Sequence, residues 1–422
     1  MDGPASAPDA GDDEHAGEAG NGPGDAGEGP READRDAAPA VSLLTIAREW
    51  GRIGCIGFGG PPAHIALLRR LCVQDRRWIP AQEFENGISA TNLLPGPAST
   101  QLAIYCAWRL RRSAGAVVGG LAFIVPGLFL ILALSAVFLA GHPPTWIRGA
   151  AEGLGAAVPA VALAAAVSLI PGSAKGIGPP GPLLAAPRVR WALYLVVGGA
   201  AAATIGPFLV VVLIACGVAE LVARRGLPGR LGGVVALGAH AVVTGGLAAV
   251  AWVAFKVGAL SFGGGFVIVP LMQADAVNRY HWMSGGQFLN AVALGQITPG
   301  PVVQTVSAVG YAAGGLGAAL LAAVVAFSPS FVFVLVGGPH FDRLRHNLGA
   351  QAFLRGSGPA AIGAIAGSAI PLGRELSHLW QVPILVAAGV WLLAARRSVV
   401  TALLAAGVIG VLAALAGLPI GP

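Results

Sequence analysis

Long apolar runs constrain this chain more than any other feature of its sequence. Residues 114–140 hold no charged side chain, and residues 149–170 hold only Glu152. An α-helix needs about 20 residues to cross the roughly 30 Å of hydrocarbon in a bilayer, so both runs are long enough. Because 55% of the chain is hydrophobic and only 11% is charged, we expect an all-α, polytopic membrane protein.

The first 40 residues differ from the rest in composition. They hold 11 of the 20 Asp and Glu residues but only two basic residues, Arg31 and Arg35. Their Gly, Ala, Pro and acidic composition offers nothing to bury, so we expect residues 1–40 to form a disordered acidic tail and not a signal peptide. The remainder has 24 Lys and Arg against 9 Asp and Glu, a balance compatible with cytoplasmic loops, anionic lipids or an anionic substrate.

The chain also repeats itself. Aligning Phe58 with Phe262 sets a shift of 204 residues, and in this register eleven pairs are identical without a gap. The pairs are Gly54/Gly258, Phe58/Phe262, Gly59/Gly263, Gly60/Gly264, Leu67/Leu271, Trp78/Trp282, Phe84/Phe288, Asn86/Asn290, Pro95/Pro299, Gly96/Gly300 and Pro97/Pro301. We therefore interpret residues 41–230 and 231–422 as two homologous transporter repeats, an organisation typical of secondary transporters.

Each half contains one Pro-Gly-Pro, at residues 95–97 and 299–301. The arms on either side of the first, residues 84–94 and 98–108, would each be about 16 Å long as helices, roughly half the membrane. Proline lacks a backbone donor and disfavours a continuous helix, and a break at membrane depth is tolerated only where protein or a polar cavity surrounds it. A simple kink would explain one motif equally well, but two at matching positions favour cavity-lining breaks.

Charges beside these motifs predict how the halves are oriented. The basic residues flanking the first motif are Arg69, Arg70, Arg76, Arg77, Arg109, Arg111 and Arg112. The matching flanks of the second motif hold only Arg279 and the uncharged residues 312–318. By the positive-inside rule, both flanks of the first motif are cytoplasmic and both flanks of the second external. This predicts a re-entrant hairpin in each half and inverted repeats.

Arg52 and Lys256 occupy one repeat position, six residues before Phe58 and Phe262. A cation near the membrane centre costs roughly 2.5–3.5 kcal/mol on insertion scales, which makes it a functional candidate. The side chains can instead extend to the membrane surface. Matching cations in both halves favour a polar cavity.

Glycines follow each cation at Gly59, Gly60, Gly263, Gly264 and Gly265. Small residues also serve close helix packing, but beside a cation and a second break we favour helix N-termini aimed at an anion. Polar side chains near the two Pro-Gly-Pro motifs can donate hydrogen bonds to oxyanion oxygens: Asn92, Ser99, Thr100, Gln101, Gln296, Thr298, Gln304 and Thr305.

The candidates for proton coupling are Glu152 and His64, with a position at the membrane surface as the alternative for both. The sequence contains no Walker A loop, zinc-ligand spacing or nucleophile elbow. We therefore expect no enzyme activity, cofactor, bound metal or nucleic-acid partner. Uphill transport would have to use an ion gradient.

Four motifs carry a resemblance to a known family: FGGPP at Phe58, LPGPAS at Leu94, SFGGGF at Ser261 and TPGPVV at Thr298. In two duplicated halves they resemble the chromate ion transporter family over residues 41–422. The resemblance implies a long-chain, two-domain carrier of the inner membrane that exports chromate, as an antiporter driven by the proton motive force. Sulfate, a tetrahedral dianion of similar shape, is the natural competitor.

The predicted substrate-binding residues combine these motifs with the two cations and nearby polar side chains. They are Arg52, Lys256, Phe58, Gly59, Gly60, Pro61, Asn92, Pro95, Gly96, Pro97, Ser99, Phe262, Gly263, Gly264, Gly265, Gln296, Pro299, Gly300 and Pro301. Transport of sulfate or another oxyanion, and an anion channel, remain alternatives to chromate efflux. The sequence leaves monomer and homodimer open.

Inversion of the halves predicts a labelling pattern. In a chain without its native cysteines, single cysteines replacing Arg76 and Arg279 should react with an impermeant maleimide from opposite membrane faces. Cysteines at Gln74 and Ser113 should react from one common face if the first Pro-Gly-Pro segment is re-entrant. Labelling of positions 76 and 279 from the same face would reject inversion.

Overall fold

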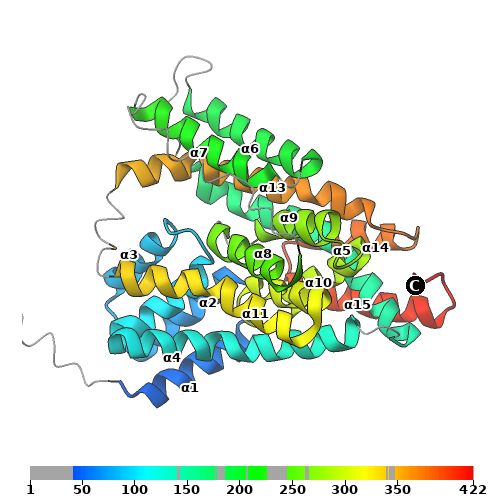
Figure 1. Ribbon diagram of the computed structural model, residues 1–422, viewed down its shortest axis with the longest axis horizontal. Coiled ribbons are helices and arrows are strands. Elements are labelled where there is room, and N and C mark those ends of the chain that lie inside the picture. The colour runs from blue at the N-terminus through cyan, green and yellow to red at the C-terminus, as the bar shows by residue number, and fades with distance from the viewer. Residues whose placement is uncertain are drawn as a thin grey trace, which may run out of the picture. The chain divides into compact units, whose positions relative to one another are not determined.

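The computed structural model describes residues 41–139, 143–175, 177, 186–205, 208–225, 245–261, 266–338, 341 and 347–421. Within these ranges every regular element is a helix and no strand occurs (Figure 1), which confirms the all-α prediction. The predicted acidic tail, residues 1–40, lies outside the described residues.

The helices fall, in chain order, into those of the first half and those of the second. Those of the first half are α1 (Leu43–Ile56), α2 (Pro61–Arg69), α3 (Ala81–Thr91), α4 (Ala98–Phe138), α5 (Thr145–Ala174), α6 (Pro187–Thr204) and α7 (Leu209–Arg225). Those of the second half are α8 (Gly246–Leu260), α9 (Ile268–Gln273), α10 (Gly285–Ile297), α11 (Thr305–Gly337), α13 (Leu348–Arg374), α14 (Gln381–Gly389) and α15 (Val399–Leu415). The short elements are the π-helical turns η2 (Arg70–Asp75), η6 (Ala274–Arg279) and η9 (Val390–Ala394), and the 3-10 turn η7 (Val302–Gln304).

Unusual backbone features recur at the shift read from the sequence. The π-helical turns η2 and η6 both span six residues and begin 204 positions apart. Arg77 and His281, also 204 apart, both have φ of 52°, a value that few residues other than glycine adopt. Shared strain at matching positions supports descent of the two halves from one duplicated unit.

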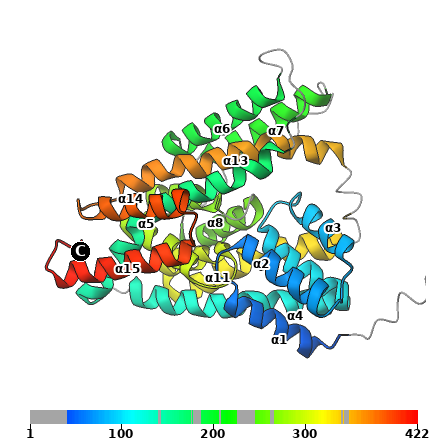
Figure 2. The same ribbon diagram turned by 180° about the vertical axis from the view of Figure 1, so that it is seen from behind.

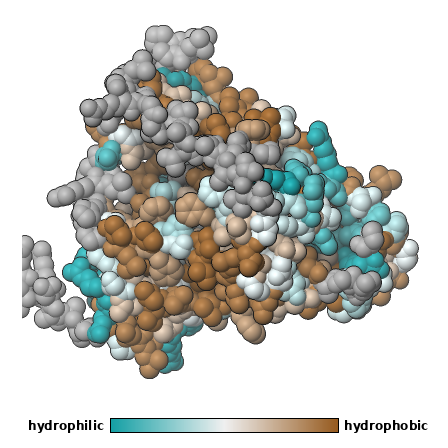
Figure 3. Space-filling model, in the orientation of Figure 1, coloured by the Kyte–Doolittle hydropathy of each residue, from teal (hydrophilic) through white to brown (hydrophobic). Residues whose placement is uncertain are grey.

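Three described helices are long and apolar enough to cross a membrane: Ala98–Phe138, Thr145–Ala174 and Val302–Gly337. The apolar segment around the first FGG motif is two helices, because α1 ends at Ile56 and α2 begins at Pro61. In Figure 3 hydrophobic residues cover the middle of the visible face, over α8 and α11, and hydrophilic residues gather toward both ends. Phe129 and Val324 leave 76% and 70% of their surface exposed, as expected for side chains that face lipid.

The first Pro-Gly-Pro lies at the tip of a helical hairpin. Arg109 forms an ion pair with Glu83, so the start of α3 lies beside the end of the first arm of α4. The backbone then leaves helical geometry at Arg111 and Arg112 and folds back, which puts Gly119 against Ala107. Both ends of the hairpin therefore lie together, the geometry that a re-entrant segment requires.

The second half repeats this path. α11 leaves helical geometry at Gly314 and Gly315 and folds back so that Gly310 packs against Ala322. Glycine at position 315 accommodates a φ of 69°. At the matching turn of the first half, Arg112 takes a φ of 48° despite its side chain, which costs energy.

α5 and α13 are the helices on which helices of the opposite half pack (Figures 1 and 2). α6 and α7 of the first half pack on α13, and α14 and α15 of the second half pack on α5. Glycines permit these close contacts: a Cβ on Gly153 of α5 would lie 2.2 Å from the Ala406 carbonyl oxygen of α15, and one on Gly198 of α6 would lie 1.9 Å from that of Ala360 on α13. Close approach through small residues is how helices associate in lipid.

This packing predicts unequal responses to one substitution within α5. Gly153→Ala forces α5 and α15 apart, and overpacking of this kind costs roughly 1–3 kcal/mol. Gly172→Ala meets no atom within 4 Å and should be neutral, or stabilise by about 0.5–1 kcal/mol, because Ala favours helix more than Gly. The apparent melting temperatures of the detergent-solubilised variants measure the difference. Equal shifts in both would contradict the close α5–α15 contact.

Candidate functional site

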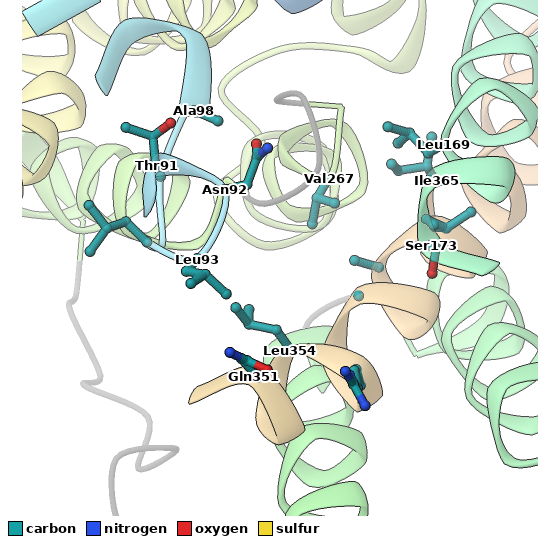
Figure 4. A pocket seen from close by; sticks show the side chains of 17 residues that line it. Thr91, Asn92, Leu93, Ala98, Leu169, Ser173, Val267, Gln351, Leu354 and Ile365 are labelled. Carbon is teal, nitrogen blue, oxygen red and sulfur yellow. The ribbon is translucent and has the colours of Figure 1, made fainter. Parts of the chain in front are cut away.

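A cavity of about 470 Å³ lies between the first Pro-Gly-Pro turn, the C-terminal end of α5 and the N-terminal end of α13. We call it the Asn92 cavity. Its polar or charged lining residues include Thr91, Asn92, Ser173, Gln351 and Arg355. Figure 4 shows Asn92 on one side of this space, with Gln351 of α13 and Ser173 of α5 across from it. The cavity is therefore built from both halves of the chain.

The local sequence fixes the wall that carries Asn92. α3 ends at Thr91 with Asn92 as its C-cap, and Pro95 and Pro97 keep the helix from continuing. Between the prolines Gly96 takes a φ of 118°, a conformation that suits glycine alone. The Gln101 amide donates to the Pro95 carbonyl over 2.7 Å and holds the turn against the start of α4.

The charge of the Asn92 cavity favours an anion. Arg355 is the one charged residue in its lining, which contains no Asp or Glu. Arg355 forms no ion pair with any acid of the described part of the chain. Amide groups of Asn92 and Gln351 and the Ser173 hydroxyl can complete a set of hydrogen-bond donors. This is the donor set that an oxyanion needs.

A basic cluster borders this cavity. A smaller space of about 30 Å³ shares Ser173 and Arg355 with it and is lined further by Glu220 and Arg224. Arg190 and Arg224 both pair with Glu220, with Nε–O distances of 2.8 Å and 2.5 Å. Two arginines on one buried carboxylate leave a net positive charge behind Arg355, which strengthens the attraction for an anion.

The two helix breaks contact each other across the halves. The Gly57 carbonyl oxygen, at the start of the first FGG break, accepts the Gly300 N–H of the second Pro-Gly-Pro over 3.0 Å. The first Pro-Gly-Pro likewise approaches α8 of the second half, since a Cβ on Gly96 would lie 3.2 Å from the Gly258 carbonyl oxygen, and Val267 lines the Asn92 cavity. Each Pro-Gly-Pro turn therefore lies against the opposite half.

The buried side chain of His64 contacts the same Gly57 carbonyl. Its side chain is fully buried, and Nε2 lies 2.9 Å from the same Gly57 oxygen. Because a carbonyl only accepts, Nε2 carries the proton, and in the neutral ring Nδ1 accepts from the Ser99 hydroxyl at 3.3 Å. The sequence-predicted residues His64, Ser99 and Gly300 thus meet around one carbonyl.

The second Pro-Gly-Pro is enclosed by protein. The Gln304 amide donates to the Ile124 carbonyl over 2.7 Å, and a Cβ on Gly127 would lie 2.1 Å from the Pro299 oxygen. Within the described residues, Gln296 Nε2 and Gln304 Oε1 are buried without a hydrogen-bond partner. Such groups are costly unless something else pairs with them. None of the described cavities opens at this motif.

The two predicted cations lie apart from the Asn92 cavity. Lys256 is ion-paired with Asp275 of η6, and its Nζ lies 5.8 Å from the centre of the Trp252 ring. Arg52 leaves 63% of its side chain exposed, with Nε 3.8 Å from Glu49, and lines a separate hollow of about 400 Å³ beside Leu71. Leu71 occupies the repeat position of Asp275. This position therefore supplies a carboxylate to the cation in the second half and an apolar side chain in the first.

The remaining predicted residues lie at the breaks themselves. Phe58 is 43% exposed. Gly59 and Gly60 have φ of 98° and 71°, and Pro61 opens α2. In the second half Pro301 is the N-cap of η7. The predicted residues Phe262, Gly263, Gly264 and Gly265 lie outside the described residues.

A second cavity of about 570 Å³ lies at the other end of α5. We call it the Glu152 cavity. It is lined by Arg148, Glu152 and Gly155 of α5 and by Glu375 after α13, among others. Gly155 and Leu169, which lines the Asn92 cavity, are 14 residues apart, about 21 Å along a helix. The C-terminal end of α5 meets the N-terminal end of α13 at the Asn92 cavity and the opposite ends meet here, so the two helices run antiparallel.

Sequence reasoning missed Arg355, Asp275 and His378. A signal for Arg355 existed: Pro159 and Pro171 of α5 match Pro359 and Pro371 of α13 at a shift of 200 residues. The gapless shift of 204 does not show this match. The shift of 200 aligns Arg355 with Gly155, and each of these lines one of the two cavities.

Comparison with known proteins gives one consistent result. The sequence profile of the family described as "Chromate transporter" matches residues 44–221 and 248–411. A chromate transport protein of Cupriavidus metallidurans is 32% identical over 350 residues, covering 80% of this chain and 84% of the relative. A chromate transport protein of Pseudomonas aeruginosa is 31% identical over 404 residues, covering 88% and 92%. An uncharacterized transporter of Methanocaldococcus jannaschii is 28% identical over 327 residues, covering 72% and 78%. No solved structure matches the chain significantly.

The Lys256–Asp275 pair predicts a non-additive response in stability. Asp275→Leu, which installs the residue of the first half, leaves Lys256 unpaired where only 18% of its side chain is exposed, and breaking a buried pair costs roughly 3–5 kcal/mol. Adding Lys256→Met should recover most of that loss, since no charge is then left unpaired. Thermal unfolding in detergent measures both variants.

The matched control is Arg52→Met in the first half. Arg52 is 63% exposed and Glu49 keeps Arg76 as a partner, so the change should cost at most about 1 kcal/mol. A double variant no more stable than Asp275→Leu would show that the pair is not the source of the loss.

Proposed function

This chain belongs to the chromate transporter family, and from that premise we propose that it exports chromate across the inner membrane as a secondary active transporter driven by the proton motive force. Family membership and the apolar helices support a membrane transporter rather than an enzyme. The sequence carries no nucleotide-binding motif, so the proposal takes the energy for uphill export from an ion gradient.

The observation that carries the proposal is the charge of the Asn92 cavity. Chromate is a tetrahedral dianion that accepts hydrogen bonds through all four oxygens. The cavity of about 470 Å³ offers it one arginine, Arg355, amide donors and no carboxylate in its lining. A guanidinium binds two oxygens of one tetrahedral anion at once. Asn92 would bind from the first half while Arg355 binds from the second.

Alternating access follows if the two halves rock against each other. The helix breaks meet across the halves through the Gly300 N–H and the Gly57 carbonyl, and α5 and α13 reach a cavity at each end. We propose that rocking opens the Asn92 cavity to one membrane face and the Glu152 cavity to the other. Inverted repeats make two such states structurally equivalent.

Sulfate transport is the second candidate. Sulfate has the charge and tetrahedral shape of chromate, and a cavity built from one guanidinium and amide donors distinguishes the two poorly. An anion channel is the third, and it would conduct without a coupled gradient.

The proposal is tested in inside-out vesicles loaded with acid, with radiolabelled chromate outside. Wild type should accumulate chromate, and an uncoupler should abolish the accumulation. Arg355→Gln removes a charge-assisted hydrogen bond worth about 1.5–3 kcal/mol, so uptake at subsaturating chromate should fall by at least about tenfold.

The control is Arg374→Gln, because Arg374 ends the same helix and lines neither cavity. It should transport normally. Equal uptake of labelled sulfate would favour the second candidate, and uptake that persists with the uncoupler would favour a channel. Normal uptake by Arg355→Gln would reject the Asn92 cavity as the substrate site.

A further inference from the structure

We propose that Glu152, which lines the cavity at the opposite end of α5 from the anion, and the adjacent His378 form the proton-binding site of this transporter. The proposal rests on the proposed function and assigns its coupling ion to named atoms. Glu152 Oε2 and His378 Nε2 lie 3.8 Å apart, with 16% and 20% of the side chains exposed. Within the described residues, His378 Nε2 is buried without a hydrogen-bond partner.

Surrounding groups aim the two side chains at each other. Gln381 Oε1 accepts the backbone N–H groups of Ser377 and His378 over 2.9 Å and 3.1 Å. This fixes the amide so that its Nε2 donates to Glu152 Oε2 over 3.1 Å. The His378 ring stacks on Trp380, with the planes 11° apart. One glutamine thus holds both the carboxylate and the loop that carries the imidazole.

Among the charged groups around Glu152, the imidazole of His378 is the one placed to share a proton with the carboxylate. On its own helix the charged neighbour is Arg148, and Glu375 after α13 also lines the cavity. His378 approaches Glu152 from beside it. α10 and its N-cap Ser284 contribute only the uncharged Ser284, Gln287 and Asn290 to the described lining. The Glu375 carboxylate is not part of the Glu152–His378 pair. It lies against Gly285 at the N-terminus of α10, where the helix dipole favours an anion. The Glu152 cavity is therefore acidic where the Asn92 cavity is basic.

Proton binding has a structural consequence at residues 419–421. Glu152 Oε1 accepts the Gly421 N–H, Arg148 donates to the Gly421 carbonyl over 3.1 Å, and the Trp380 indole donates to the Pro419 carbonyl over 3.0 Å. A proton added to the pair sits on the carboxyl Oε2 or the imidazole Nε2. On the carboxyl it removes the negative charge, which weakens the hydrogen bond from Gly421. Residues 419–421 would then loosen their hold on α5.

His64, the other sequence-predicted candidate, does not fit this role. Both ring nitrogens have partners, the Gly57 carbonyl and the Ser99 hydroxyl, and the buried ring packs edge-on against Phe123 at 5.0 Å. His64 leaves none of its surface exposed, whereas His378 leaves 20% of its side chain exposed. A proton exchanging with water needs access, so His64 is better explained as a positioning residue for the helix breaks.

The test separates coupling from substrate binding by measuring two activities of purified protein in liposomes. Glu152→Gln keeps the shape of the side chain and one of its two acceptor oxygens but cannot exchange a proton. It should lose accumulation of radiolabelled chromate driven by an imposed pH gradient. It should keep exchange of internal unlabelled for external labelled chromate, which needs no net proton movement. His378→Gln should shift the pH dependence of gradient-driven accumulation.

Each outcome decides the question. Glu375→Gln, a carboxylate of the same cavity, is the matched control and should keep gradient-driven accumulation. Accumulation by Glu152→Gln at the wild-type level overturns the proposal. Loss of exchange as well as accumulation also overturns it, since the role is then structural or in substrate binding. If wild type itself neither exchanges nor accumulates chromate, the proposed function fails and not the proton site.

Discussion

The structure depends on how backbone groups are satisfied where helices break inside an apolar environment. An unpaired N–H or C=O in hydrocarbon costs several kcal/mol, and proline and glycine leave such groups free at both motif types. Here the Gly300 N–H and the Gly57 carbonyl satisfy each other. Because donor and acceptor come from different halves, this one contact lowers the cost of both breaks and joins the halves at this point.

Composition and spacing predicted the architecture because membrane burial leaves few choices. Apolar runs force helices, and Asn92 and Gly96 beside the first Pro-Gly-Pro line a cavity, whereas none of the described cavities opens at the second. Inversion of the halves, the substrate roles of Arg52 and Lys256, and coupling to protons stay predictions. The antiparallel course of α5 and α13, which occupy matching places in the halves, supports inversion.

What the sequence could not show was pairing across the fold. Lys256 and Arg52 look equivalent in the repeat, but Lys256 pairs with Asp275, whereas Arg52 has Leu71 at the counterpart position and shares Glu49 with Arg76. Arg355 was hidden because the repeat register changes from 204 to 200 before α13. Glu152 and His378 are 226 residues apart in the chain, and no local pattern joins them.

The unequal cations also give the two halves different net charges at matching positions. Lys256 with Asp275 is a neutral pair, so its half can move without electrical work at this position. In the other half Arg52 and Arg76 share the single carboxylate of Glu49, which leaves one uncompensated positive charge. Moving a full charge across 100 mV is worth roughly 2.3 kcal/mol. The two halves would thus differ electrically: at this position one carries a neutral pair and the other a net positive charge.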